Sequence, residues 1–147
     1  MKASIWFRAL AIILAIFTLG HTLGTTGAVT AAPEEAAVIA TMQGYRVPVM
    51  GFLRTYWEFY RGFSISISVL LAALAVIAWQ VGSLSRRNPG QALPFAITVL
   101  IACIAQAIVC FVYFFTAPMV MSSAAVVCAG VGVALVRRDA KAVSDRQ

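Results

Sequence analysis

Residues 54–63 carry the side chains best suited to chemistry. If this segment is helical, Arg54, Glu58 and Arg61 stand at positions i, i+4 and i+7 of one face, where the carboxylate can pair with either guanidinium group. A second face is aromatic, and its rings are those of Tyr56, Phe59, Tyr60 and Phe63. Two interpretations stay open: an aromatic belt with snorkelling arginines at a membrane surface, or a polar ligand site at the mouth of a helix bundle.

The only histidine, His21, lies near the end of the first apolar run, in Leu-Gly-His-Thr-Leu-Gly. By helical rise it lies about 24 Å from Ile5, close to the far edge of a hydrocarbon core about 30 Å thick. Since Arg54, Glu58 and Arg61 precede the next apolar run at that same face, we expect His21 to meet them. The alternative is an interfacial histidine that bonds a backbone carbonyl. The candidate ligand-binding residues are His21, Arg54, Tyr56, Trp57, Glu58, Tyr60 and Arg61.

The remaining residues give little reason to expect a metal or a cofactor. Cys103, Cys110 and Cys128 all lie within apolar runs, and they form no Cys-x-x-Cys pair. A single histidine excludes bis-histidine haem within one chain. We therefore predict no metal ligands, no catalytic residues of a known motif and no cofactor.

The composition indicates that these residues are carried by a membrane protein. Hydrophobic residues make up 62% of the 147 and charged residues 11%, whereas soluble domains are about 45–50% apolar and roughly 25% charged. A membrane span needs about 20 apolar residues, and the stretches 5–23, 62–84, 93–115 and 118–136 each satisfy this. The sequence predicts an all-α fold: a four-helix transmembrane bundle in a single membrane domain. The last two spans form a tight hairpin at Pro118.

The basic residues predict the orientation of these spans. Eight of the eleven Lys and Arg residues flank the predicted spans on one side. The other three lie in residues 25–61, together with three glutamates. The positive-inside rule then places both termini in the cytoplasm, which an even number of spans requires. A net charge of +6 would suggest nucleic acid for a soluble protein, but charges gathered beside apolar runs do not.

The first apolar run allows a second interpretation. A basic start, an apolar core at 9–19 and small residues at 28–32 resemble a cleavable signal peptide, whose removal would leave three spans. We favour a retained helix because the apolar stretch continues to Leu23, and because residues 28–32 lie far from the end of the core.

Residues 25–61 are predicted to form the one large extracytoplasmic loop, between helices one and two. Pro33, Glu34 and Glu35 are typical of a helix start, and Gly44 is expected to end that helix. Residues 47–53 are apolar but interrupted by proline and glycine, so we expect them to lie in the interface or against the bundle. At the other end of the chain, the polar residues 140–147 predict a frayed tail.

Two motifs resemble a family of small bacterial four-helix integral membrane proteins of no assigned function. They are Leu-Gly-His-Thr around His21 and Arg-x-Tyr-Trp-x-Phe-Tyr-x-Gly-Phe at residues 54–63. The resemblance covers roughly the first half of the chain, and the last two helices match only as hydrophobic spans. It implies the bacterial inner (cytoplasmic) membrane and transfers no activity.

These observations favour a non-catalytic protein that binds a lipid, a quinone-like ligand or a partner protein at its outer face. One alternative is a small dimeric transporter, although the predicted spans hold no carboxylate for proton coupling. The other is a membrane enzyme that uses His21 and Glu58 as an acid–base pair. The expected partners are membrane lipid, a hydrophobic small molecule or a membrane protein, and not nucleic acid. Small residues in the last helix also suit a homo-oligomer.

Overall fold

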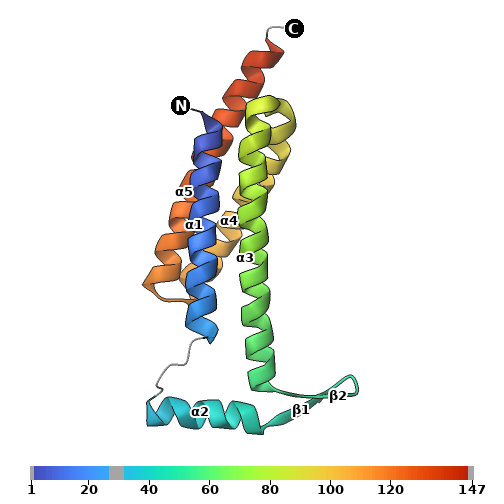
Figure 1. Ribbon diagram of the computed structural model, residues 1–147, viewed down its shortest axis with the longest axis vertical. Coiled ribbons are helices and arrows are strands. Elements are labelled where there is room, and N and C mark those ends of the chain that lie inside the picture. The colour runs from blue at the N-terminus through green and yellow to red at the C-terminus, as the bar shows by residue number, and fades with distance from the viewer. Residues whose placement is uncertain (1, 27–31, 146–147) are drawn as a thin grey trace. The chain divides into compact units, whose positions relative to one another are not determined.

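The computed structural model describes residues 2–26 and 32–145. In this part of the chain the elements are α1 (Ala3–Thr26), α2 (Pro33–Gly44), β1 (Arg46–Val49), β2 (Phe52–Thr55), α3 (Tyr56–Arg87), α4 (Pro89–Tyr113) and α5 (Thr116–Ser144) (Figure 1). Helices α1, α3, α4 and α5 are each long and apolar enough to cross a membrane. The predicted all-α class and its four long apolar helices are therefore confirmed. The candidate signal-peptide cut falls on residues 28–32, of which 28–31 lie outside the described residues.

The chain divides into two compact units. The four-helix unit (residues 2–17 and 71–145) contains the first part of α1, the later part of α3, and all of α4 and α5. The hairpin unit (residues 18–26 and 32–70) contains the rest of α1, the helix α2, both strands and the start of α3.

Phe7 of α1 joins three helices in the four-helix unit. Its side chain is fully buried. A Cβ built at Gly82 of α3 would lie 3.0 Å from the Cβ of Phe7, and one built at Gly132 of α5 would lie 2.8 Å from its ring. Since glycine has no side chain, both helices can approach Phe7 this closely. Leu10 and Leu14 extend the same buried stripe of α1.

Helices α4 and α5 pack along one another as a tight hairpin. Asn88 caps α4 by accepting a 3.0 Å hydrogen bond from the N–H of Gln91, and Pro89 occupies the first turn. Only Phe114 and Phe115 connect the two helices, so the break comes slightly before the predicted one. Pro118 lies within the first turn of α5, where its missing N–H has no intrahelical partner to lose.

Basic residues gather at one end of the four-helix unit. Because Gly82 and Gly132 both pack against Phe7, this end brings together the start of α1, the end of α3 and the part of α5 beyond Val136. It carries Lys2, Arg8, Arg86, Arg87, Arg137 and Arg138. The uncharged connection between α4 and α5 lies at the other end, since α4 alone rises about 37 Å.

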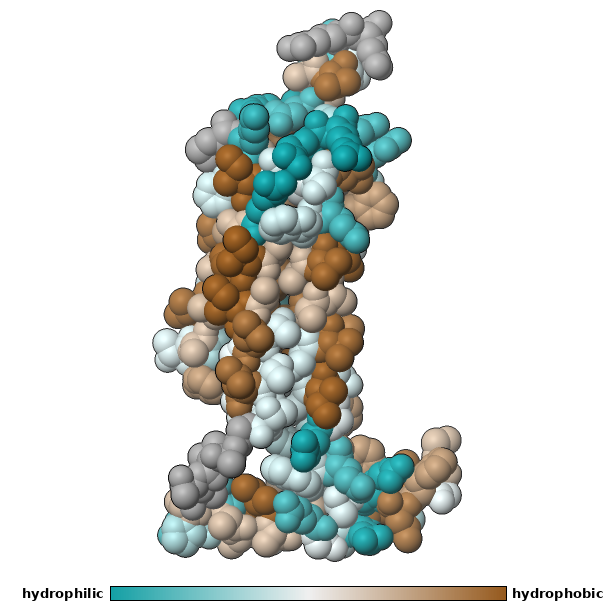
Figure 2. Space-filling model, in the orientation of Figure 1, coloured by the Kyte–Doolittle hydropathy of each residue, from teal (hydrophilic) through white to brown (hydrophobic). Residues whose placement is uncertain are grey.

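Large apolar side chains cover the outward surface of the four-helix unit between these ends. Ile12, Ile101 and Ile108 are 55%, 61% and 60% exposed. Figure 2 shows hydrophobic residues along the visible faces of α1 and α3, with hydrophilic residues gathered where α3 ends. Soluble proteins rarely expose apolar surface on this scale, whereas the hydrocarbon of a bilayer solvates it.

The hairpin unit contains a β-hairpin that was not predicted from the sequence. Strands β1 and β2 pair antiparallel, with Val49 opposite Phe52. Met50 and Gly51 connect them with φ of +49° and +88°, as in a type I′ turn. The interruption of this segment by Pro48 and Gly51 argued against regular structure, but a two-stranded ribbon tolerates proline at an edge. Both the hairpin and α2 run crosswise to the start of α3 (Figure 1).

The helices extend beyond the predicted apolar spans. Helix α3 begins at Tyr56 and not near Gly62, and α1 continues to Thr26. The tail that was expected to fray is helical as far as Ser144. A prediction from hydropathy includes only the part of a helix that is apolar enough to lie in hydrocarbon. It therefore omits the polar turns at the helix ends. Helix α2 occupies the predicted positions, with Pro33 in its first turn.

Candidate ligand-binding site

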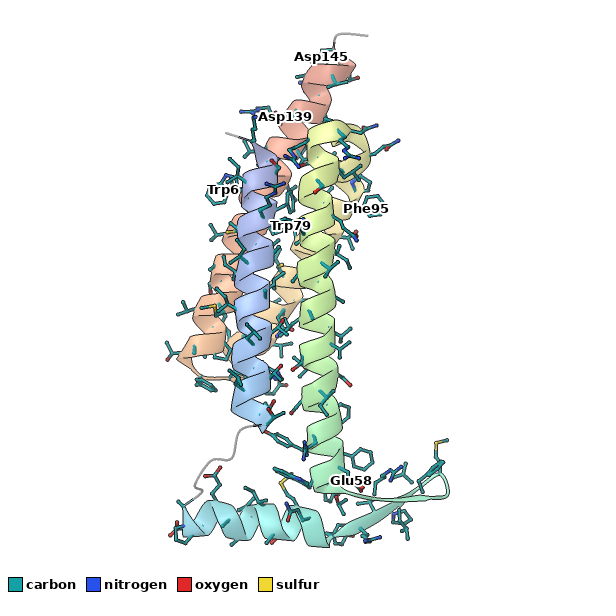
Figure 3. The ribbon with its side chains drawn as sticks, viewed as in Figure 1. Trp6, Glu58, Trp79, Phe95, Asp139 and Asp145 are labelled. Carbon is teal, nitrogen blue, oxygen red and sulfur yellow. The ribbon has the colours of Figure 1, made fainter. Side chains whose placement is uncertain are left out.

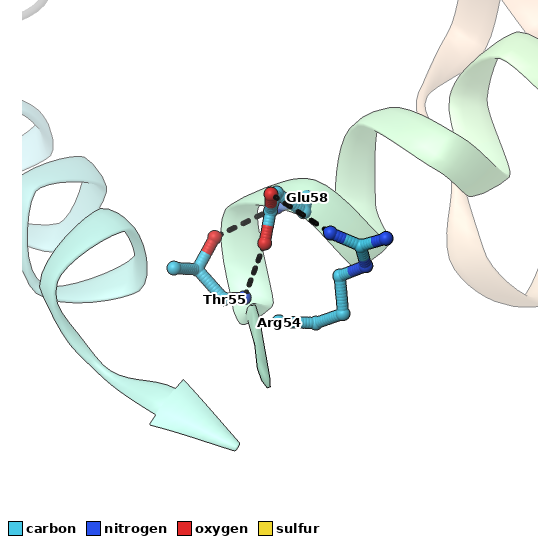
Figure 4. A network of polar contacts seen from close by, with 3 residues as sticks. All are labelled: Arg54, Thr55 and Glu58. Carbon is cyan, nitrogen blue, oxygen red and sulfur yellow. Dashed lines mark hydrogen bonds and ion pairs between the residues drawn. The ribbon is translucent and has the colours of Figure 1, made fainter. Parts of the chain in front are cut away.

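Thr55 and Glu58 build the junction between β2 and α3 (Figure 4). Oε2 of Glu58 accepts a 2.7 Å hydrogen bond from the N–H of Thr55, and the N–H of Glu58 donates a 3.1 Å bond to Oγ1 of Thr55. This reciprocal pair is a capping box, which satisfies backbone N–H groups that the first turn of a helix leaves unpaired. The pattern Thr-x-x-Glu could have predicted it, but the segment was interpreted as helical from Arg54 onward.

Arg54 lies in β2, so the helical spacing considered for Arg54, Glu58 and Arg61 does not hold. Arg54 still reaches Glu58, because its Nη1 lies 3.8 Å from Oε1 of the carboxylate. Its guanidinium group also lies 5.9 Å from the centre of the Phe52 ring. About half of each charged side chain is exposed, and a pair this exposed contributes only about 0–1 kcal/mol to stability. Both charges therefore remain available to a ligand.

The aromatic residues at this junction are divided between two ring stacks and a groove. Tyr56 stacks on Tyr45 with 5.8 Å between ring centres, and Trp57 stacks on Tyr60 with 5.5 Å between ring centres. The predicted aromatic face is therefore split, because its two tyrosines take partners outside it. Its two phenylalanines line the groove.

An open groove of about 340 Å³ lies beside the junction. Arg54 and Glu58 supply its charge, and Phe59 and Phe63 supply its apolar wall. A Cβ at Gly62, which also lines the groove, would have no atom within 4 Å, so the glycine leaves the space open. A charged rim beside an aromatic wall suits a ligand with a polar head and an apolar body.

His21 takes part in a different set of contacts, which joins α1 to α3. Its Nδ1 lies 3.0 Å from Oγ of Ser68, and Oγ1 of Thr22 lies 2.9 Å from the same oxygen. The hydroxyl group of Thr22 also lies 2.8 Å from the carbonyl oxygen of Thr18. Polar side chains of this kind hydrogen-bond helices together in membranes. Sequence spacing does not identify Ser68 as the partner of His21, since the pairing joins positions 47 residues apart.

The structure therefore brings only part of the predicted site together. Arg54 and Glu58 share the groove, while the three aromatic candidates Tyr56, Trp57 and Tyr60 lie in the stacks beside it. Arg61 is exposed, and within the described residues it makes no ion pair. Ser68, the partner of His21, lies roughly 15 Å of helical rise beyond Glu58. Among residues 2–26 and 32–145, no hydrogen bond or ion pair joins His21 to Glu58.

Metal-ligating side chains do not cluster in the described part of the chain. There, no group of three or more His, Cys, Asp or Glu residues is arranged to hold a metal ion. Cys103, Cys110 and Cys128 are buried and form no disulfide. Nε2 of Gln106, a polar residue within α4, lies 3.5 Å from the sulfur of Cys110.

The fold and the groove together define a helical protein with four helices apolar enough to cross a membrane and an amphipathic groove at the start of α3. No protein-family model, curated protein or solved structure matches the chain. The resemblance to small bacterial four-helix membrane proteins therefore stays a prediction from the two motifs.

Proposed function

We propose that this chain is a non-catalytic integral protein of the bacterial inner membrane that binds an amphipathic ligand, a lipid or a quinone-like molecule, at its outer face. In this proposal α1, α3, α4 and α5 cross the bilayer, and both termini lie in the cytoplasm. The single observation that carries the ligand proposal is the groove of Arg54, Glu58, Phe59 and Phe63.

The charges support the orientation. Arg86 and Arg87 lie in the last turn of α3, whereas Glu58 lies in its first turn. The basic end of the four-helix unit would face the cytoplasm under the positive-inside rule. The start of α3, and with it the groove, would then lie at the outer surface.

The groove side chains determine the class of ligand. The guanidinium group of Arg54 can donate to a phosphate or carbonyl oxygen, and Glu58 can accept from an ammonium or hydroxyl group. The rings of Phe59 and Phe63 can pack against an apolar body. Since Phe63 is 69% exposed, a ligand that covers it would remove substantial apolar surface from water.

Two observations favour binding over the alternative functions. His21 and Glu58 have different partners, so neither orients the other for acid–base chemistry. The carboxylates of the long helices lie near helix ends, as Glu58 does in α3 and Asp139 does in α5. Small proton-coupled exporters of this helix number rely on a carboxylate in the middle of the membrane, and its absence from the middle of these helices disfavours the transporter.

Native mass spectrometry of the protein, purified in mild detergent, tests the proposal. Gly62→Leu would fill the groove, since the glycine has free space around it. Glu58→Gln would remove the charge but keep the capping box, because glutamine serves equally well at that position. Arg46→Gln is the matched control. Like Glu58→Gln, it removes one charge from the hairpin unit. Arg46 lies opposite Thr55 in the strand pair and does not line the groove.

The expected result is a bound small molecule on the parent protein and on Arg46→Gln, which Gly62→Leu loses and Glu58→Gln retains weakly. The same bound mass on all four proteins would place the ligand elsewhere. A bare parent protein would contradict the proposal, and so would a retained protein partner in place of a small molecule.

A further inference from the structure

Arg8 is a charged residue embedded in the apolar part of α1. Its guanidinium carbon lies 5.0 Å from the centre of the Trp79 ring of α3. Its Nε atom is buried, and within the described residues it has no hydrogen-bond partner. A buried donor without an acceptor is unfavourable. Arg8 as a whole is only partly buried, and its two terminal guanidinium nitrogens are not among the buried unpaired atoms, so they can bond an acceptor that comes from outside the protein.

An apolar groove of about 300 Å³ adjoins Arg8 between α1 and α3 of the four-helix unit. Its floor is made of small buried residues, such as Ala11 and Ala75, which are 6% and 8% exposed. Its walls are made of half-exposed large ones, namely Ile12, Val76 and Trp79. The indole N–H of Trp79 is the only polar group among the lining side chains, and Figure 3 shows Trp79 between α3 and α1.

Arg8 stands at the head of this groove. Arg8, Ile12 and Ala15 are spaced i, i+4 and i+7, so they share one face of α1. Arg8 is the one of the three nearest the start of α1, which lies at the basic end of the unit. Trp79 connects Arg8 to the groove. Its ring lines the groove and also makes the cation–π contact with the guanidinium group of Arg8.

We propose that this groove binds one acyl chain of an anionic phospholipid of the cytoplasmic leaflet, and that Arg8 binds the phosphate of that lipid. Charge complementarity selects this occupant. The walls are apolar, the head of the groove is cationic, and Lys2, Arg86 and Arg87 lie at the same end of the unit. Basic pockets between membrane helices on the cytoplasmic side bind such headgroups. The inference rests on the proposed crossings and orientation, but not on a ligand in the outer groove.

Quenching of Trp79 fluorescence by brominated lipids tests this inference. The substitutions Trp6→Phe and Trp57→Phe leave Trp79 as the only tryptophan. The protein is reconstituted into phosphatidylcholine vesicles in which the same mole fraction is either brominated phosphatidylglycerol or brominated phosphatidylcholine. Three variants are compared with this parent: Arg8→Gln removes the phosphate ligand, Ala15→Leu fills the groove, and Arg137→Gln removes one exposed charge at the same end.

The expected result is a preference of about tenfold for phosphatidylglycerol around Trp79, since charge-assisted hydrogen bonds are worth about a factor of ten or more. Arg8→Gln should bring that preference close to one, and Arg137→Gln should leave it unchanged. Ala15→Leu should weaken quenching by both lipids. If Arg8→Gln does not fold, Ala15→Leu still tests the groove, because this variant keeps Arg8 and changes only the space for the acyl chain.

Equal quenching by the two lipids in the parent would overturn the inference, and so would an equal loss of preference in Arg8→Gln and Arg137→Gln. A dimer in native mass spectra that Ala15→Leu dissociates would place a second copy in the groove and would also overturn it. None of these outcomes depends on whether a ligand binds in the outer groove beside Gly62. The experiments can therefore contradict one proposal and leave the other standing.

Discussion

The ring of Phe7 in α1 packs directly against the backbone of Gly132 in α5. A Cβ at position 132 would lie 2.8 Å from Cε2 and 2.9 Å from Cζ of that ring. Gly82 of α3 contacts the same residue nearer its backbone, where a Cβ would lie 3.0 Å from the Cβ of Phe7. One buried ring thus fixes the approach of three helices in the four-helix unit, and it sets the level at which their basic ends lie.

Gly132→Ala is therefore expected to destabilise the protein. The added methyl group must displace a fully buried ring, and overpacking of this kind costs about 1–3 kcal/mol. Gly130→Ala in the same helix is the control, because a Cβ there meets no atom within 4 Å. Thermal unfolding in detergent measures the difference. Equal melting temperatures for the two variants would show that α5 does not pack on Phe7.

The capping box predicts different effects for two substitutions of one residue. Glu58→Ala removes the acceptor for the N–H of Thr55 and should lower the stability of the start of α3 by about 0.5–1.5 kcal/mol, the net contribution of one hydrogen bond. Glu58→Gln should have little effect there. Hydrogen exchange of the Thr55 amide measures both. Similar exchange rates in Glu58→Ala and in the parent would mean that the box does not form.

The apolar helices were predictable and the contacts between them were not. Runs of about 20 apolar residues report the spans directly, and Pro33 and Gly44 marked both ends of α2. The β-hairpin was not predicted, because Pro48 and the Met50–Gly51 turn both depart from the usual sequence signals of a strand pair. The partner of His21 escaped because Ser68 is one of three serines that open the second apolar run, and spacing alone does not show which one faces α1.

The hydrogen bonds of Ser68 should contribute measurably to stability. Ser68→Ala deprives both His21 and Thr22 of a partner, and polar contacts between membrane helices contribute about 0.6 kcal/mol on average and up to about 1.7. Ser66→Ala is the matched control, since within the described residues that hydroxyl group bonds only the carbonyl of Gly62 in its own helix. Unfolding free energies of Ser68→Ala, His21→Phe and the double variant should be non-additive. Strict additivity would contradict direct contact.

Met50 occupies a backbone conformation that a methionine rarely adopts. With φ at +49°, an L residue with a long side chain is strained by roughly 1–2 kcal/mol. Met50→Asn should stabilise the hairpin, because Asn-Gly is the preferred type I′ turn, and Met50→Val should destabilise it. Exchange protection of the Phe52 amide reports the change. A hairpin that Met50→Val leaves fully protected would disprove the turn assignment.

Four crossings with the basic ends in the cytoplasm underlie both proposed ligand sites, so the side of each end is the property to measure first. Single cysteines at Lys2, Met50 and Ser144, placed in a background without the three native cysteines, can be labelled with a membrane-impermeant maleimide in intact cells. Met50 is 95% exposed, so its substitute is accessible to the reagent.

We predict that Met50→Cys is labelled in intact cells, whereas Lys2→Cys and Ser144→Cys are labelled only after the membrane is permeabilised. Labelling of Ser144→Cys from outside would contradict the orientation. Loss of the Lys2→Cys label from the mature protein would show that the first helix is cleaved, which would leave three crossings and not four.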